Sequence, residues 1–230
     1  MSDYLEQDIS LRSFYGKFPT LEGIKEQLEE KQKSVTQTGR SVLVSQLQEQ
    51  YTGVAITQAT QDNINALSKD TAFTITTGHQ LNLFSGPMYY IYKILSVINL
   101  TEQLAKKYPE NSFVPVFWMA TEDHDFEEIN YFNFKGKKVT WDRPDGGAVG
   151  RFSLDGIQEV FTSFSKQLGD SKNAVFLSEL FERAYVSHAS LAEATRYIAN
   201  ELFKMYGLVI LDADDQRLKN IFAPIMKDEL

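Results

Sequence analysis

Apolar residues change their spacing between residues 71 and 120, and the change predicts three elements. TAFTITTG (71–78) is rich in β-branched and aromatic residues, which predicts a short strand that ends near Thr76. PMYYIYKILSVINLTEQLAKKYP has apolar residues three and four apart, as in a long amphipathic helix. SFVPVFWMA (112–120) is apolar almost throughout, as in a strand buried on both faces. A strand, a helix and a second strand within about 50 residues form a βαβ unit, which implies a parallel sheet with a right-handed connection.

The long helix is expected to begin at Pro87, with Ser85 or Gly86 as its cap, because proline suits the first helical position. Core packing is expected for at least two of its three tyrosines near the start, since aromatic residues at helical spacing usually bury. The expected buried stripe consists of Met88, Ile91, Leu95, Ile98 and Leu104.

The regions on either side of this unit complete the predicted architecture. Residues 1–70 read as an N-terminal helical segment, with Thr20 as one helix cap. Residues 71–230 read as the core, with a small β-rich insertion at about 128–155 that contains a hairpin around Lys135-Gly136. Helices follow, and then the apolar strand GLVILDADD. The expected fold class is α/β: a doubly wound, mostly parallel sheet with a small β insertion and an N-terminal helical segment.

Composition excludes several classes of protein. The 230 residues carry a formal net charge of −8, which argues against general affinity for nucleic acid or anionic membranes. The chain has no cysteine, so disulfides, thiolate metal sites and a cysteine nucleophile are excluded. Neither a signal peptide nor an apolar stretch long enough to span a membrane is present, so a cytoplasmic location is expected.

The last residues, DDQRLKNIFAPIMKDEL, place Leu218, Ile221, Phe222 and Ile225 on one face of a predicted helix. KDEL at the end of a secreted chain is a retention signal of the endoplasmic reticulum, but no signal peptide delivers this chain there. A longer protein interrupted within a helix is the preferred interpretation.

Polar residues follow three predicted strands, in TTGHQ, ATEDHD and LDADD. Ligands of open α/β sheets bind beyond the carboxyl ends of the strands, so these residues are expected to converge on one rim. The rim would contain Thr77, Gly78, His79, Gln80, Glu122, Asp123, His124, Asp125 and Asp212.

The loop TGHQLNLFSGP (77–87) is longer than most strand-to-helix connections. Gly78 would allow close approach of the backbone, and Ser85-Gly86 would offer N–H groups at the positive end of the helix to a phosphate or carboxylate. An ordinary connecting loop is the alternative, because the segment matches neither a Walker loop nor GxGxxG.

The sequence EDHD (122–125) is the densest group of ionisable residues. A histidine among carboxylates gains a raised pKa and can act as a general acid or base. One histidine and several carboxylates from one loop are an incomplete metal site, so no metal is predicted. A solvated acidic loop with a capping aspartate is the alternative.

Three segments together resemble the bacillithiol-biosynthesis cysteine-adding enzyme family: TGHQLNLFSGPMYYIYKILSVINLTEQL, VPVFWMATEDHDFEEINYFNFKGKKVTW and NELFKMYGLVILDADDQRLK. They occur in the family's order over residues 60–230. The resemblance implies a Rossmann-like core, of which residues 71–230 are an incomplete part, a coiled-coil arm for dimerisation and a chain about twice as long as this one. It implies ligation of L-cysteine to the amino group of glucosaminyl-malate, with a homodimer as the full-length form.

The resemblance also implies roles for matching residues. Thr77, Gly78, His79 and Gln80 match a T-G-x-Q motif in which the third position varies, so His79 is expected to bind. Asp123, His124 and Asp125 are the expected catalytic group, which would orient and deprotonate the amine; Glu122, Ser85 and Gly86 are expected to bind substrate or nucleotide.

ATP or another nucleotide is the expected source of energy, because a carboxylate must be activated before it forms an amide. Two other interpretations stay open: a nucleotide- or sugar-binding module without complete catalysis, and a metal-dependent hydrolase. Whether the shorter chain is active alone is also open.

Overall fold

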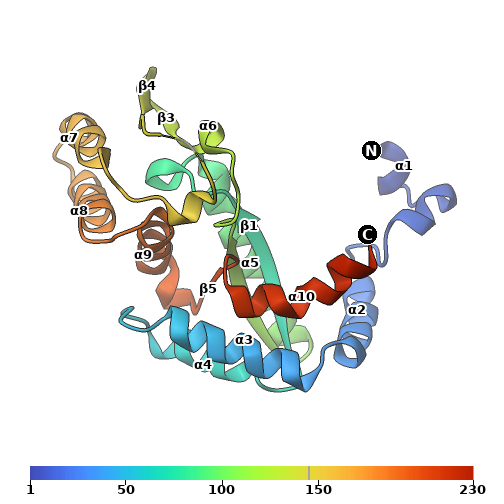
Figure 1. Cartoon of the computed structure of the whole chain (residues 1–230). Coiled ribbons are helices and arrows are strands. Elements are labelled where there is room, and N and C mark those ends of the chain that lie inside the picture. Colours follow the sequence, from blue (N-terminus) through green and yellow to red (C-terminus); the bar gives the residue numbers. More distant parts are fainter. Residues whose placement is uncertain (145, 230) are drawn as a thin grey trace.

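The structure is a computed structural model that describes residues 1–144 and 146–229. Five strands lie in these residues, and they form a three-stranded parallel sheet and a separate antiparallel hairpin (Figure 1). The sheet contains β1 (Ala72–His79), β2 (Ser112–Met119) and β5 (Val209–Asp212), and the hairpin contains β3 (Tyr131–Phe134) and β4 (Lys137–Thr140).

Helices surround the sheet and extend from it at both ends of the chain (Figure 1). The α-helices are α1 (Ser2–Leu5), α2 (Leu21–Ser34), α3 (Gln37–Gln50), α4 (Gln58–Ala66), α5 (Met88–Lys107), α6 (Phe126–Ile129), α7 (Ile157–Leu168), α8 (Lys172–Val186), α9 (Leu191–Phe203) and α10 (Gln216–Asp228). The short 3-10 helices are η1 (Ile9–Phe14), η2 (Leu83–Ser85), η3 (Val149–Arg151) and η4 (Lys204–Tyr206).

The parallel sheet has the order β1-β2-β5, with the most apolar strand in the centre. Strand β2 pairs with β1 along its whole length and with β5 from Val116 to Met119. The side chains of Val114, Phe117 and Met119 are fully buried, so the predicted cover on both faces is confirmed for most of the strand; Trp118 is the exception and is exposed. Helix α5 connects β1 to β2, so the predicted βαβ unit and the predicted α/β class are both confirmed.

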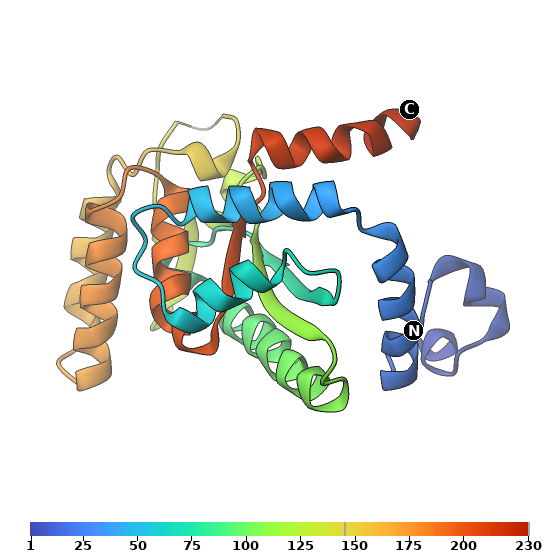
Figure 2. The same cartoon turned by 90° about the horizontal axis from the view of Figure 1, so that it is seen from below.

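Helices cover both faces of this sheet (Figure 2). On one face Phe117 of β2 packs edge-on against Tyr90 of α5, with ring centroids 5.4 Å apart. On the other face Trp118 lies with Leu43 of α3 and Phe222 of α10 in the wall of one groove. Because successive side chains of a strand point to opposite faces, α5 and α10 lie on opposite sides of the sheet.

The predicted helical segment at the N-terminus is present, and three threonines begin its main helices. The hydroxyl oxygens of Thr20, Thr36 and Thr57 accept backbone hydrogen bonds at the starts of α2, α3 and α4. Leu47 of α3 and Ile64 of α4 are buried in the same hydrophobic core as the sheet. A domain boundary at residue 70 and the bounds of the β insertion stay predictions.

The first strand is longer than predicted, because pairing with β2 continues to its end. Gly78 pairs with Trp118 and His79 pairs with Met119, so Thr77, Gly78 and His79 belong to β1 and not to the loop after it. The predicted cap of α5 is also wrong, since Pro87 itself is the cap residue and Met88 begins the helix.

The buried face of α5 differs from the predicted one. Ile98 and Leu104 are buried as expected, but Met88 is exposed, and Ile91 and Leu95 are only partly buried. Of the three tyrosines only Tyr90 is buried, which contradicts the expectation for at least two. The full buried set on this helix is Tyr90, Ile94, Val97, Ile98, Thr101 and Leu104.

The hairpin and the C-terminal helix follow the sequence prediction. Lys135 and Gly136 join β3 to β4 with φ angles of 50° and 75°, as a two-residue turn of the mirror-image type requires. Asp215 begins α10 by accepting hydrogen bonds from the N–H groups of Arg217 and Leu218. Within residues 1–144 and 146–229, no helix combines the length and the apolar character needed to cross a membrane.

Candidate functional site

The carboxyl ends of the three parallel strands lie side by side at one end of the sheet, as the sequence predicted. His79, Met119 and Asp212 stand in one row of the strand register. Just beyond this row, the Thr121 hydroxyl donates a hydrogen bond to the Asp212 carboxylate. The Asp214 N–H donates to the Thr121 hydroxyl oxygen at 3.1 Å, so the loops after β2 and β5 are held together.

Gln80 joins the loop after β1 to the loop after β2. Its side-chain amide donates to Oδ2 of Asp123 at 3.2 Å and to Oε2 of Glu128 at 2.6 Å. Glu128 lies on α6 and was not among the predicted site residues, because nothing in its local sequence separates it from a solvated glutamate. One amide between two carboxylates fixes the spacing of negative charge at the mouth of the site.

Asp123 is the best-anchored member of the EDHD segment. Its Oδ1 accepts hydrogen bonds from the N–H groups of His124 at 2.7 Å and Asp125 at 3.1 Å. Partial burial favours the neutral acid, but the hydrogen bonds from Asp125, Gln80 and His124 outweigh it and lower the pKa of Asp123. Asp123 is therefore a stable negative charge at neutral pH.

The expected catalytic group of Asp123, His124 and Asp125 is joined through backbone N–H groups only, and no hydrogen bond links the three side chains to one another. The His124 side chain is 89% exposed, and its Nδ1 lies 3.8 Å from Oδ1 of Asp123. Asp125 and Glu122 are exposed as well. The local density of ionisable residues was visible in the sequence, but the engagement of Asp123 with Gln80 was not, because those two residues are 43 positions apart.

The fold holds His79, at the carboxyl end of β1, in one tautomer. Its Nδ1 lies 3.0 Å from the carbonyl oxygen of Gln80, and a carbonyl can only accept, so Nδ1 carries the proton and Nε2 presents a lone pair. The ring packs edge-on against Tyr90 with centroids 5.7 Å apart. Burial lowers the pKa of His79, and the positive charge of Lys93 lowers it further; together they outweigh the raising effects of the Gln80 carbonyl and of the Asn82 side chain.

Lys93 supplies a positive charge that sequence reasoning missed. Its ammonium group donates to the carbonyl oxygen of Gly78 at 2.5 Å and lies 5.3 Å from the centroid of the Tyr89 ring. Lys93 is in the second turn of α5, and only the return of that helix across β1 brings it to the strand end. Its position on the helix after a candidate loop was the one available signal.

The loop between β1 and α5 is anchored through an unusual backbone at its tip. Phe84, Ser85 and Gly86 all have left-handed φ angles, of 51°, 68° and 61°. A Cβ on Gly86 would lie 2.4 Å from Cβ of Asn82, so only glycine fits there. The Phe84 N–H donates to the Tyr185 hydroxyl oxygen at 2.8 Å, and its ring is buried among aromatic side chains of β3, α7 and α8.

Two expectations for this loop are wrong. The Gly86 N–H is not free for an anion, because it donates to the Leu83 carbonyl at 2.9 Å in a tight turn. Gly78 is not required by space, since a Cβ there would have an ordinary contact 3.6 Å from the Trp118 carbonyl oxygen. Ser85 lies beside a groove of about 550 Å³ between this loop, the β3-β4 hairpin, α7 and α8, which fits its expected place at a binding surface.

Tyr90 ends in a cavity that is too small for a substrate. Its side chain is only 3% exposed, and its hydroxyl has no hydrogen-bond partner among the described residues. Burial raises the pKa of this hydroxyl far above its usual value, so it is neutral. The cavity beside it, which Gln80 and Asn82 also line, has a volume of about 10 Å³, room for one water at most.

The second cluster on the rim consists of Arg151, Asp214 and Lys219. Arg151 donates through Nε to Oδ2 of Asp214 at 2.5 Å, and Lys219 pairs with the same carboxylate. These hydrogen bonds lower the pKa of Asp214 although its partial burial alone would raise it. Within the described residues, no group of three His, Asp or Glu side chains is arranged to hold a metal ion.

Comparison with known proteins identifies the family. The family model described as "Bacillithiol biosynthesis BshC, N-terminal Rossmann-like domain" matches residues 1–230. A protein of Flavobacterium johnsoniae named "Putative cysteine ligase BshC" is 54% identical over 230 residues, which are 100% of this chain and 44% of that protein.

Two further relatives have the same name. The protein of Christiangramia forsetii is 51% identical over 232 residues, with 99% of this chain and 43% of that protein covered. The protein of Staphylococcus saprophyticus is 30% identical over 223 residues, with 92% and 41% covered. The chain thus spans less than half the length of these relatives, and the predicted Rossmann-like fold is confirmed. The chain belongs to the BshC family of bacillithiol biosynthesis, and it matches the N-terminal Rossmann-like domain of that family.

Proposed function

We propose that the full-length protein is a ligase that joins L-cysteine to the amino group of glucosaminyl-malate, and that residues 1–230 form one part of its substrate site. The observation that carries the proposal is the hydrogen-bonded bridge from Gln80 to Asp123 and Glu128 at the carboxyl ends of the strands. Two carboxylates are thus joined to Gln80, the residue after His79, and Lys93 reaches the Gly78 carbonyl just before it, in a chain of the BshC family.

The charges divide the proposed site into two parts. Lys93 favours an anionic group, such as a carboxylate or the phosphate of a nucleotide, near the end of β1. Asp123 and Glu128 favour the ammonium form of an amine before it reacts. Gln80 lies between the two parts, and Thr77, Ser85 and the backbone of Gly86 border them.

Amide formation sets the chemistry that these residues must support. The carboxylate of cysteine is first activated as an acyl phosphate or acyl adenylate, for which ATP or another nucleotide is the proposed source. The amine nitrogen then attacks the acyl carbon, the phosphate or nucleotide leaves, and a base takes the proton of the amine.

By its geometry His79 fits the role of that base better than His124, although the matching position of the T-G-x-Q motif varies within the family; relatives with another residue there would need a different base. It is neutral because burial lowers its pKa, its Nδ1–H is held by the Gln80 carbonyl, and its Nε2 carries the lone pair that can accept a proton. His124, with Asp125 and Glu122, stays a candidate for binding at the entrance, because its exposed ring can reach a substrate only from solvent.

The test uses the full-length protein with glucosaminyl-malate, cysteine and ATP, and mass spectrometry detects the cysteinyl conjugate. His79→Gln should lower turnover about 10²-fold or more, the usual contribution of a general base. His124→Ala, the matched histidine control, should stay near wild type. The reverse pattern would return the base role to His124.

The same assay separates the other interpretations. If the 230-residue chain binds nucleotide but forms no product, the result would support a binding module within a larger enzyme. Loss of activity with a chelator and its recovery with one divalent metal, together with release of a hydrolysed substrate, would favour the hydrolase. The homodimer, the coiled-coil arm and the cytoplasmic location stay predictions for the full-length protein.

A further inference from the structure

The two edges of the parallel sheet differ in how their backbone groups are satisfied. At the edge formed by β5, the Ile210 N–H donates to the Tyr51 hydroxyl oxygen at 2.7 Å, and its carbonyl accepts from Arg196 at 2.9 Å. The N–H and C=O of Asp212 both bond to the side-chain amide of Gln50, at 2.9 and 3.1 Å. Side chains therefore close this edge, and no further strand can pair there.

The edge formed by β1 is open in its middle. The carbonyls of Thr71 and His79 point to β2, where they accept from Ser112 and Ala120. Since the backbone groups of successive residues in a strand alternate in direction, those of Thr74 and Thr76 point away from β2. In the part of the chain that the structure describes, Arg40 and Lys93 reach only the end carbonyls of this edge, those of Ala72 and Gly78.

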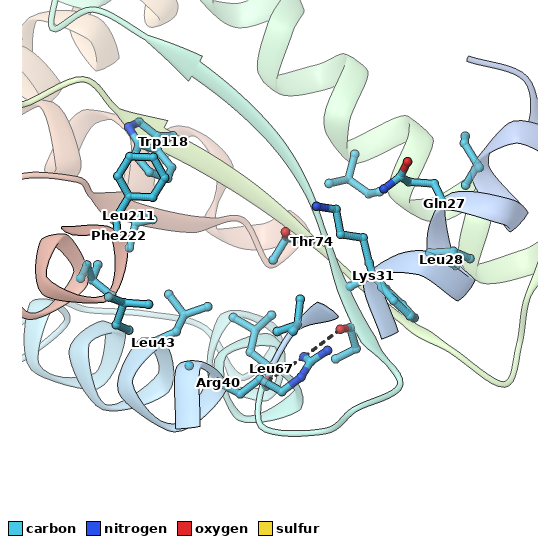
Figure 3. Close-up of a pocket in the computed structure, with 18 of the residues that line it drawn as sticks. Gln27, Leu28, Lys31, Arg40, Leu43, Leu67, Thr74, Trp118, Leu211 and Phe222 are labelled. Atoms are coloured by element: carbon cyan, nitrogen blue, oxygen red, sulfur yellow. Dashed lines mark hydrogen bonds between the residues drawn. The ribbon is translucent and has the colours of Figure 1, made fainter. Parts of the chain in front are cut away.

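An apolar groove of about 660 Å³ runs along this open edge (Figure 3). Figure 3 shows Trp118, Leu211 and Phe222 at one end of the groove and Leu28 and Lys31 at the other, with Thr74 between them. Helices α3 and α10 supply one wall, while Leu28 of α2 and Leu100 of α5 supply the other. The groove is therefore bounded by helices of both layers of the fold, as the position of a strand in an α/β sheet is.

Large apolar side chains that face this groove are incompletely covered. Trp118, on the central strand, is 43% exposed, and Phe222 and Ile225 of α10 are each 55% exposed. A central strand of a parallel sheet is normally buried on both faces. The apolar face of α10 that the sequence predicted thus lacks part of its cover.

The hand of the crossover connections predicts where the next strand lies. Helix α5 lies on one face of the sheet and carries the chain from β1 to β2, in the direction of β5. Helix α10 follows β5 on the other face of the sheet. A right-handed connection through that face leads from β5 back toward β1. The positions of β2 and β1 are already filled, and the first vacant position is the open edge of β1.

We propose that this groove receives a further parallel strand from the polypeptide that follows residue 230 in the full-length protein. The relatives supply that polypeptide, because this chain matches only 44% of the F. johnsoniae protein. The strand would be apolar along its length, about five to eight residues long, since helices cover both of its faces. The sheet would then have the order β5-β2-β1 followed by the new strand.

This placement completes the candidate site. The direction of winding reverses between β1 and the new strand, and ligands of doubly wound sheets bind at that reversal, beyond the carboxyl ends of the strands. His79, Gln80 and Lys93 lie at the carboxyl end of β1 and would form one side of the crevice. The loop after the new strand would form the other side. The inference rests on the fold and the family, not on the proposed ligase reaction.

Hydrogen exchange of the full-length protein tests the proposal without an activity assay. Mass spectrometry with fragmentation to single residues would compare the amides of Thr74 and Thr76 with those of Phe73 and Ile75, which face β2. We expect all four amides to be protected to a similar degree, at protein concentrations where size-exclusion chromatography with light scattering finds only monomer.

Two other patterns of exchange contradict the proposal, and a separate assay distinguishes it from the proposed function. Fast exchange of Thr74 and Thr76 beside slow exchange of Phe73 and Ile75 would mean that β1 remains an edge. Protection that appears only at concentrations where the protein dimerises would assign the groove to a second copy. Loss of ligase activity in a separate assay, with protection retained, would overturn the proposed function and leave the new strand in place.

Discussion

The β5 edge and the β1 edge of one small sheet show two different ways to treat unpaired backbone groups. On the β5 edge Gln50, Tyr51 and Arg196 replace a neighbouring strand with side-chain hydrogen bonds. On the β1 edge the backbone groups of the middle residues Thr74 and Thr76 point away from β2, and Thr74 lines an apolar groove. Since a buried polar group without a partner is costly, the first edge is built to stay an edge, while the second is built to be paired.

The largest expected effect is on the closed edge, where Arg196 is 7% exposed. Arg196→Leu removes hydrogen bonds to Ile210 and Gln50 and leaves the Ile210 carbonyl without its donor, while Gln50 Oε1 keeps the N–H of Asp212. The free energy of unfolding should fall by about 3 kcal/mol, measured by urea denaturation. Arg217→Leu is the matched control, because its ion pair with Glu49 is exposed and should contribute less than about 1 kcal/mol. Equal losses of stability in the two variants would show that the β5 edge does not depend on the hydrogen bonds of Arg196.

Thr74→Pro tests the open edge in the full-length protein. Proline removes the N–H that points away from β2, and this matters only where a further strand accepts it. We expect a loss of about 2 kcal/mol in the free energy of unfolding. Thr74→Val keeps the N–H and the branched shape, so it should have little effect. A proline variant as stable as the valine variant would mean that β1 is an edge in the whole protein.

Lys93→Met removes the charge at the carboxyl end of the open edge and keeps most of the apolar side chain. Loss of its hydrogen bond to Gly78 should reduce the free energy of unfolding by about 1 kcal/mol, because the partly exposed ammonium is also solvated by water. Lys106→Met in the exposed last turn of α5 is the control. If thermal denaturation gives both variants the same stability, the Gly78 carbonyl has another hydrogen-bond donor in solution.

The smallest expected effect is a pH dependence of stability from His79. Burial lowers its pKa in the folded state below the value of about 6.5 in the unfolded chain. The unfolded state therefore binds more protons, so this contribution is complete above pH 6.5 and is lost as the pH falls toward the folded-state pKa. Wild type should lose more stability than His79→Gln between about pH 7.5 and 5. If urea denaturation shows the same change of unfolding free energy with pH for both proteins, the pKa of His79 is not lowered in the folded state.

Much of the secondary structure was predictable from local patterns in the sequence. The apolar run of β2, the turn at Lys135-Gly136 and the threonine cap of α2 follow from short segments and were found as predicted. The end of β1 was not predictable, because pairing with β2 continues through Gly78, a residue of low strand propensity. The buried face of α5 was also misjudged, since apolar residues occur all around its first two turns.

The candidate site was predictable as a place but not as a set of contacts. The topology rule brought the ends of β1, β2 and β5 to one rim. The rule does not predict that Asp123 is held by Gln80 and by backbone N–H groups, so that the His124 side chain has no hydrogen-bonded partner among the described residues. Nor could it place Lys93 at Gly78, because that contact depends on how far α5 rotates about its axis.

By itself the sequence determined the elements, their order, the family resemblance and the polar character of the strand ends. These depend on interactions between residues close in the chain, or on motifs that stand in the chain as written. Only the tertiary structure decided that His79 of the candidate site is held in one tautomer while His124 is exposed, which carboxylates share a donor and which edge of the sheet is open. Those properties depend on contacts such as Gln50 with Asp212, which are 162 positions apart and form only when the layers pack.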